Sequence, residues 1–172
     1  MKAPSIEEVY LNLSSLFPVW VRLIEFKTRL MEAEEASDGN PRILIISPPT
    51  DPGIKCIIEA NPGGENYLLC FSKSIRQRAI DYLGIETSSY IRLVVSPFFR
   101  IPFENNFFDL ILANCFFDFC HESKIMEATK EISRVTVLNG KLLSVYMDLP
   151  YNFSGKLWGW LFRRFPFLSQ GC

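Results

Sequence analysis

The chain has 172 residues, and its hydrophobic content of 48% is enough to close the core of one domain of ordinary size. Its net charge of -1 and pI near 5.9 give no electrostatic reason to expect nucleic acid as a partner. Five cysteines at irregular spacing, with no signal-peptide pattern, favour the reducing cytosol. No apolar run reaches the ~18 residues that span a bilayer.

The first 40 residues are predicted to form a helical extension that packs on the domain. Ser5 and Glu8 have the spacing of a capping box, and apolar residues then recur at steps of three and four. Pro18 breaks this pattern, and a second helix is expected to reach about Glu35. The turn formers of 37–41 close the extension.

Residues 41–150 alternate short apolar runs with helical stretches, which is typical of a doubly wound parallel sheet. Five runs are predicted as strands: 42–47, 67–71, 91–95, 108–113 and 141–147. Helices are predicted at 72–83, capped by Ser72 or Ser74, and at 122–135. A shorter helix is expected to stop at Gly63-Gly64, and Asn139-Gly140 to turn the chain into the fifth strand.

The last segment, 151–172, is predicted to be an amphipathic tail with one short helix. The fifth strand would then be a sheet edge whose unpaired backbone groups need a cover. The aromatic run of 156–168 (KLWGWLFRRFPFL) could cover that edge, grip a protein partner or a second copy, or lie on an anionic membrane surface. Covering the edge is the simplest of these.

The stretch Ile101 to Ala113 (IPFENNFFDLILA) resembles the class I S-adenosylmethionine-dependent methyltransferases of the type 11 group, which carry an "lPF…FDLV" segment. Glu131 to Val135 (EISRV) is similar to the family's "E-x-x-RVL" helix, and Asn139 to Leu143 (NGKLL) to its turn into strand five. The resemblance covers residues 42–147. It implies a Rossmann-like α/β fold with a mostly parallel five-stranded sheet of order 3-2-1-4-5, and S-adenosylmethionine as cofactor.

Two of the matching residues have structural roles to play. Asp109 begins a buried strand, where its carboxylate can accept backbone N–H groups, and Arg134 lies near a helix end, where it can meet the partial negative charge. Their presence therefore supports the fold and says little about catalysis.

The segment that the family uses to hold its cofactor departs from the pattern. Ile45 stands where the family has an acid, and Ser47-Pro48-Pro49 replace a glycine-rich turn. Proline removes N–H donors and fills space that glycine leaves open. Asp51 could replace the acid with a shift of register, and Gly53 remains.

The next two strands carry a second departure. Cys70 stands where the family has an acid for the ribose hydroxyls, and a thiol is a weak acceptor. Phe98 could stack on adenine, although a core role for the Phe98-Phe99 pair is favoured. The resemblance places these residues around the cofactor: Ser47, Asp51, Gly53, Cys70, Phe71, Ser72, Pro97, Phe98 and Asn114.

His121 is the only histidine and follows strand four together with Cys115, Asp118 and Cys120. A general-base role is conceivable, but a loop histidine beside two buried thiols is favoured. The spacing predicts no metal site, and no catalytic residue is assigned.

Two functions are therefore predicted as alternatives. The first is a non-catalytic, methyltransferase-like module that binds S-adenosylmethionine weakly or not at all, and that binds a protein partner or dimerises through the sheet edge and the tail. The second is an active methyltransferase on a small molecule with an atypical cofactor loop. A membrane-surface protein anchored by its tail is a third, less favoured reading.

Overall fold

The computed structural model describes residues 39–51, 53–84 and 90–145, so the predicted helical extension and the tail lie outside the described residues. The strands are β1 (Arg42–Ile46), β2 (Glu65–Cys70), β3 (Arg92–Val95), β4 (Phe108–Asn114) and β5 (Thr136–Val145). The helices are α3 (Gly53–Ala60), α4 (Lys73–Leu83), α5 (Phe116–Phe119) and α6 (Glu122–Val135). No helix within these ranges is long and apolar enough to cross a membrane.

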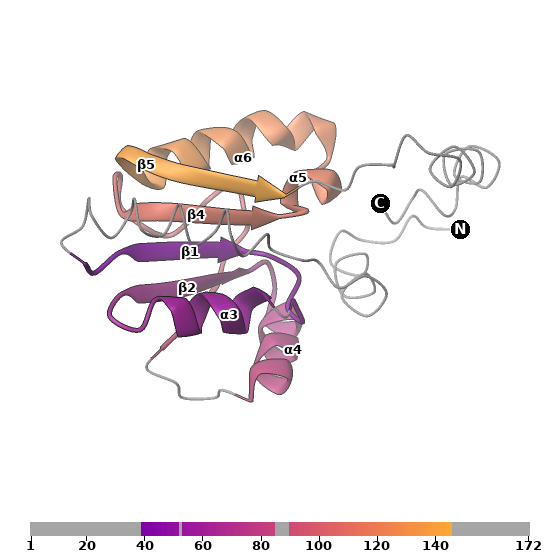
Figure 1. Ribbon diagram of the computed structural model, residues 1–172. Helices are drawn as coiled ribbons and strands as arrows, with labels where there is room; N and C mark the ends of the chain where they lie inside the picture. Colours follow the sequence, from indigo (N-terminus) through magenta and orange to yellow (C-terminus); the bar gives the residue numbers. More distant parts are fainter. Residues whose placement is uncertain (1–38, 52, 85–89, 146–172) are drawn as a thin grey trace, which may run out of the picture.

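The strands form one parallel sheet of order β3-β2-β1-β4-β5, which confirms the predicted topology (Figure 1). β1 is the central strand, and Leu44 lies opposite Tyr67 of β2 on one side and Ile111 of β4 on the other. β2 and β3 therefore lie on one side of β1, and β4 and β5, which follow them in the sequence, lie on the other. In open α/β sheets, this change of side places a crevice at the carboxyl ends of the central strands.

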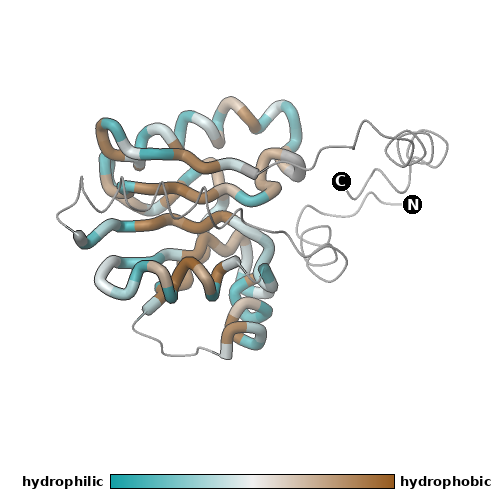
Figure 2. The backbone as a smooth tube through the Cα atoms, in the orientation of Figure 1, coloured by the Kyte–Doolittle hydropathy of each residue, from teal (hydrophilic) through white to brown (hydrophobic). Residues whose placement is uncertain are grey.

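Each face of the sheet has its own apolar core, because successive strand residues point to opposite faces. Ile43 and Ile45 pack with α3 and α4, whereas Leu44 and Ile46 pack with α6. All four side chains are fully buried. Figure 2 shows the resulting hydrophobic band along β1 and β4, which is why both strands read as continuous apolar runs in the sequence.

The helices predicted at 72–83 and 122–135 agree with the structure, and their caps explain where they begin. The Ser72 hydroxyl accepts the N–H of Ile75 at 3.1 Å, which confirms Ser72 as the N-cap of α4. Gly84 ends that helix with φ of 69°, a left-handed conformation that glycine adopts at little cost. At Gly64, an added Cβ would overlap the Pro41 carbonyl and the Asn61 side chain.

The turn predicted at Asn139-Gly140 is present, but β5 starts earlier than expected. β5 starts at Thr136, directly after α6, and Asn139-Gly140 lie inside it. Phe108 pairs with Thr136 and Leu110 with Lys141, so residues 137–140 form an irregularity in the ladder. Asn139 has φ of 67°, which matches the turn-forming residue type, but the turn is accommodated within the strand.

Candidate functional site

The residues that the resemblance placed around a cofactor lie where the first four strands end. Ser47, Asp51 and Gly53 follow β1, and Asn114 ends β4. The remaining members end or follow β2 and β3: Cys70, Phe71, Ser72, Pro97 and Phe98. The structure thus gathers them at the carboxyl edge of the sheet, where ligands bind in this class of fold. Their contacts decide what they can do there.

The loop after β1 is buried and bonded within the chain. Ser47 is 1% exposed and Asp51 is 2% exposed. The Asp51 carboxylate accepts the N–H of Gly53 at 2.7 Å and the side-chain amide of Asn114 at 2.7 Å. Burial raises the pKa of Asp51, and its hydrogen bonds act in the opposite direction. Asp51 therefore bonds the first N–H of α3, which begins at Gly53.

The end of β2 offers a buried thiol. Cys70 is fully buried, and its Sγ lies 3.9 Å from the carbonyl oxygen of Leu68. Burial raises the pKa of Cys70 to about 12, so the thiol stays protonated at neutral pH. Ser72, two residues on, is used as the N-cap of α4. Neither residue supplies the carboxylate that a ribose site in this fold uses.

Aromatic rings pack together where β2, β3 and β4 end. The ring of Phe98 meets those of Phe71 and Phe116 edge-on, with centroids 5.7 and 5.5 Å away. Phe98 is 9% exposed and belongs to the core on the α6 face, which agrees with the core interpretation. Its neighbour Phe99 is 45% exposed and lies outside that core. Pro97 is also exposed.

His121 is exposed and caps α6. Its Nδ1 accepts the N–H of Ser123 at 3.3 Å and lies 2.8 Å from the Ser123 hydroxyl. Cys115 and Cys120 are both buried. This arrangement agrees with the interpretation of a loop histidine beside two buried thiols, with one ring nitrogen, Nδ1, engaged in the cap.

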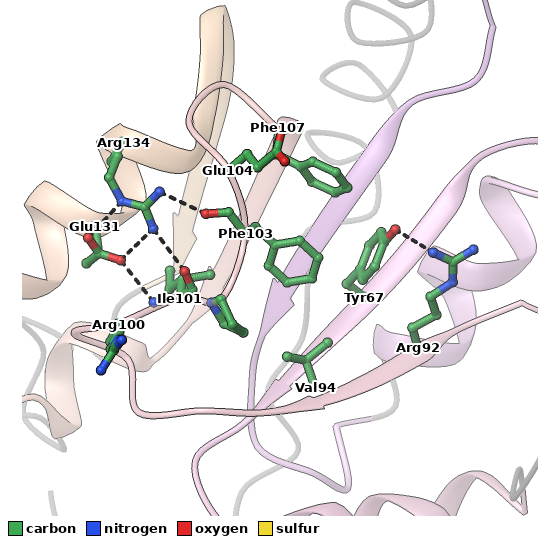
Figure 3. A pocket seen from close by; sticks show the side chains of 11 residues that line it. Tyr67, Arg92, Val94, Arg100, Ile101, Phe103, Glu104, Phe107, Glu131 and Arg134 are labelled. Carbon is green, nitrogen blue, oxygen red and sulfur yellow. Dashed lines mark hydrogen bonds and ion pairs between the residues drawn. The ribbon is translucent and has the colours of Figure 1, made fainter.

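A groove of about 910 Å³ lies on the α6 face of β2 and β3, and none of the predicted cofactor residues lines it (Figure 3). Tyr67, Val94 and Phe103 form its apolar surface, and the rings of Tyr67 and Phe103 meet edge-on at 5.0 Å. Arg92 lies at one side, with its guanidinium 2.9 Å from the Tyr67 hydroxyl and 3.1 Å from Glu65. Figure 3 shows Arg100 on the opposite side.

One wall of this groove is held by an arginine whose role the sequence did not reveal. Arg134 donates to the carbonyls of Ile101 at 2.9 Å and Phe103 at 2.8 Å (Figure 3). It also pairs with Glu131 at 2.8 Å, and Glu131 accepts the N–H of Ile101 at 2.9 Å. We expected Arg134 to meet the end of its own helix, but it fastens the 101–105 loop. Only the spacing of Glu131 and Arg134, three residues apart, signals the pair.

Asp109 performs the role predicted for it. Its carboxylate accepts the N–H of Arg42 at 2.7 Å, and the residue is 8% exposed. The Arg42 guanidinium lies over the ring of Phe107, with 4.6 Å to the centroid. Asp109 therefore ties β4 to the start of β1, and Phe107, just before β4, adds a second contact with Arg42.

The comparison with known families agrees with this fold. Residues 57–144, more than half of the chain, match the type 11 family model described as "Methyltransferase domain". The chain belongs to this family, within the class I S-adenosylmethionine-dependent methyltransferases. No curated protein gives a significant sequence match to the chain.

Solved structures show the same architecture at low identity. A Pyrococcus horikoshii protein is 19% identical with a TM-score of 0.57, over 80% of this chain and 66% of its own. A protein from Methanococcus maripaludis, titled a putative S-adenosyl-L-methionine-dependent methyltransferase, is 18% identical with a TM-score of 0.57, over 99% of this chain and 77% of its own. The [4+2]-cyclase SpnF is 18% identical with a TM-score of 0.56, over 83% of this chain and 60% of its own. Several matched structures are longer than this chain, which spans 66% of the Pyrococcus horikoshii protein and 54–56% of two other matched structures.

Proposed function

We propose that this chain is a methyltransferase-like module that binds S-adenosylmethionine weakly or not at all and does not transfer methyl groups. The observation that carries the proposal is the end of β2. A fully buried, protonated Cys70 stands where the family places the acid that accepts the ribose hydroxyls. A thiol that is both buried and protonated is a poor substitute for an exposed carboxylate.

The loop after β1 supports the same conclusion. Pro48 and Pro49 carry no N–H, and the one carboxylate of the loop, Asp51, is buried with both oxygens bonded within the chain. The loop therefore has few groups left to receive a polar ligand. One matched structure is named as a [4+2]-cyclase, so a protein with this fold can carry a name other than methyltransferase.

The test is isothermal titration calorimetry of the full chain with S-adenosylmethionine and with its demethylated product. We expect no saturable heat with either compound at millimolar concentration. A dissociation constant in the micromolar range would overturn the proposal. It would then favour the alternative, an active methyltransferase on a small molecule, which membership of the family supports.

We further propose that the module acts by binding a protein partner, or a second copy, through the β5 edge. No strand among the described residues pairs with the outer side of β5. Leu138 is 88% exposed and Leu142 is 45% exposed, beside a groove of about 410 Å³ between α6 and residues 137–140. An unpaired edge with exposed apolar side chains is a ready site for pairing with another chain.

Leu138→Lys tests the edge, because a lysine there disfavours strand pairing. We expect the variant to shift the mass measured by light scattering toward that of a monomer. Met126→Lys is the matched control, since Met126 is 65% exposed on α6 and does not line the groove. An equal mass for wild type and both variants across concentrations would exclude a dimer through this edge. We place the protein in the reducing cytosol, in keeping with Cys56, Cys70 and Cys120 as free thiols.

A further inference from the structure

One part of the sheet has no described helix over it. Parallel sheets are normally covered on both faces. α4 packs on β2 and β3, and Figure 1 shows α3 and α4 on the β2 side of β1. The face that these two helices share, here called the α3 face, continues over β4 and β5, while α6 packs on the opposite face. Among the described residues, no helix lies along β4 or β5 on the α3 face.

This part of the α3 face is apolar and carries one basic side chain. Leu110 and Leu112 of β4 belong to the core on this face and are fully buried. Leu143 of β5 lies beside Leu112 and packs against the same core. Lys141 precedes Leu143 by two residues, so its side chain points to the same face. Full burial of two leucines needs an apolar layer above them, and Lys141 favours an acidic group in that layer.

The segment directly before β1 has the matching pattern. In a helix over 20–35, five apolar residues would lie on one side: Trp20, Leu23, Ile24, Leu30 and Met31. The last turn of that helix would carry three acids, Glu32, Glu34 and Glu35. The segment after β5 has the opposite charge, because residues 156–172 include one lysine and two arginines and no acid. Charge therefore favours the segment before β1.

The length and direction of this segment fit as well. A helix over 20–35 would be about 24 Å long, close to the ~23 Å of the seven-residue strand β4. Because Arg42 begins β1, a helix that ends at residue 35 has its last turn near the amino edge of the sheet. Lys141, opposite Leu110 in the first half of β4, lies toward that edge. The helix would therefore run antiparallel to β4 and start near the carboxyl edge.

We propose that residues 20–35 dock as a helix on the α3 face of β4 and β5, with the three leucines beneath it and its acidic turn beside Lys141. The chain before Pro18 then lies at the carboxyl edge, next to Asn114 at the end of β4. These first residues are placed to cover the edge where ligands bind in this class of fold. The docking does not depend on whether the adenosyl compounds bind.

Zero-length cross-linking with a carbodiimide tests the docking in the full chain, because it joins a lysine only to a carboxylate in contact with it. We expect Lys141 to be joined to the acids of 32–35 within one chain. Lys130 is the matched control, since it is an exposed lysine on α6, which packs on the opposite face. The link to Lys141 should be at least about tenfold more abundant than any link from the same acids to Lys130. Equal abundances would overturn the proposal. Links found only between light and heavy chains of an isotope-mixed sample would also overturn it, because a second copy would then be the occupant.

Two adjacent substitutions provide a second readout. Leu143→Glu places a charge on the α3 face, whereas Leu142→Glu places one on the opposite face, where Leu142 is 45% exposed. Hydrogen exchange should show the amides of 20–35 protected in wild type and in Leu142→Glu. In Leu143→Glu they should exchange at least about tenfold faster, relative to the amides of β1. Equal exchange in the two variants, or no protection of 20–35 in wild type, would contradict the docking. Binding of the adenosyl compounds, which decides the proposed function, is measured separately and changes neither result.

Discussion

Arg134→Ala is the substitution with the largest effect expected outside the core. It removes the bonds to Ile101 and Phe103 and the pair with Glu131. Each bond from a charged donor contributes about 1.5–3 kcal/mol in a buried site. The side chains of Arg134 and Glu131 are 32% and 20% exposed, so hydrogen bonds to water offset part of the lost free energy. We expect a loss of about 2–3 kcal/mol in total, and a midpoint of thermal unfolding roughly 4–12 °C lower.

Lys124→Ala is the matched control for Arg134→Ala. Lys124 lies on the same helix and pairs with Glu127 at 2.8 Å with the same spacing, but both side chains are about half exposed. An exposed pair contributes less than about 1 kcal/mol. Denaturant unfolding followed by circular dichroism measures both variants. Equal losses for the two would refute the reasoning, because the loop contacts of Arg134 would then contribute nothing.

The same pair predicts how the effect depends on pH. The hydrogen bond from Arg134 is the main reason why the pKa of Glu131 lies below its ordinary 4.5. A lowered pKa in the folded state stabilises the protein above the unfolded value, and this contribution is lost as pH falls through the folded value. The difference in unfolding free energy between wild type and Arg134→Ala should therefore be full at pH 7 and shrink below about pH 4.5. A difference that stays constant down to pH 3 would contradict this cause.

Three further predictions concern the strand ends. Cys70 should resist iodoacetamide at pH 8 until the protein unfolds, because it is fully buried and its pKa is about 12. Half-buried Cys56 should react first, as peptide mass mapping would show. Equal reaction rates for the two cysteines would count against this prediction. Burial raises the pKa of Asp51 above 3.8, so wild type loses stability as pH rises through the pKa of Asp51 in the folded state. The unfolding free energy of Asp51→Asn should therefore increase relative to that of wild type over this pH range. Urea titrations that show no such trend would argue against burial as the main influence on this carboxyl group. Asp109→Ala should lose about 1–3 kcal/mol by leaving the Arg42 N–H unbonded, as measured by urea unfolding, and a loss below ~0.5 kcal/mol would mean that water replaces the carboxylate.

The positions of the strands could be predicted from the sequence because buried strands leave a strong local signal, whereas their order in the sheet came from the family resemblance. β1 and β4 read as continuous apolar runs, since neighbours cover both of their faces. The "FD" pair at Phe108 and Asp109 and the spacing of Glu131 and Arg134 then identified the family. Ser72 could be assigned as a cap because its hydroxyl satisfies a nearby N–H.

Other features depend on contacts between residues far apart in the chain. Asp51 bonds the first N–H of α3 and is itself held by Asn114, 63 residues away, a contact that no local pattern in the sequence indicates. Asn139-Gly140 has the composition of a turn and interrupts the pairing of β5 with β4, but the earlier pair of Thr136 with Phe108 starts the strand before it. The groove beside Tyr67 and Phe103 is bounded by a loop that Arg134 holds in place. The spacing of apolar residues along the sequence does not predict such a loop.

The most direct test of the central claim is a set of amide nitrogen–proton spectra recorded while the demethylated cofactor product is added to the full chain. We predict that the signals of Ser47, Gly53, Cys70 and Asn114, at the carboxyl ends of β1, β2 and β4, keep their positions up to millimolar ligand. Saturable shifts of those signals in the micromolar range would contradict the account, because the region would then accept the compound that its buried thiol and self-bonded carboxylate should exclude.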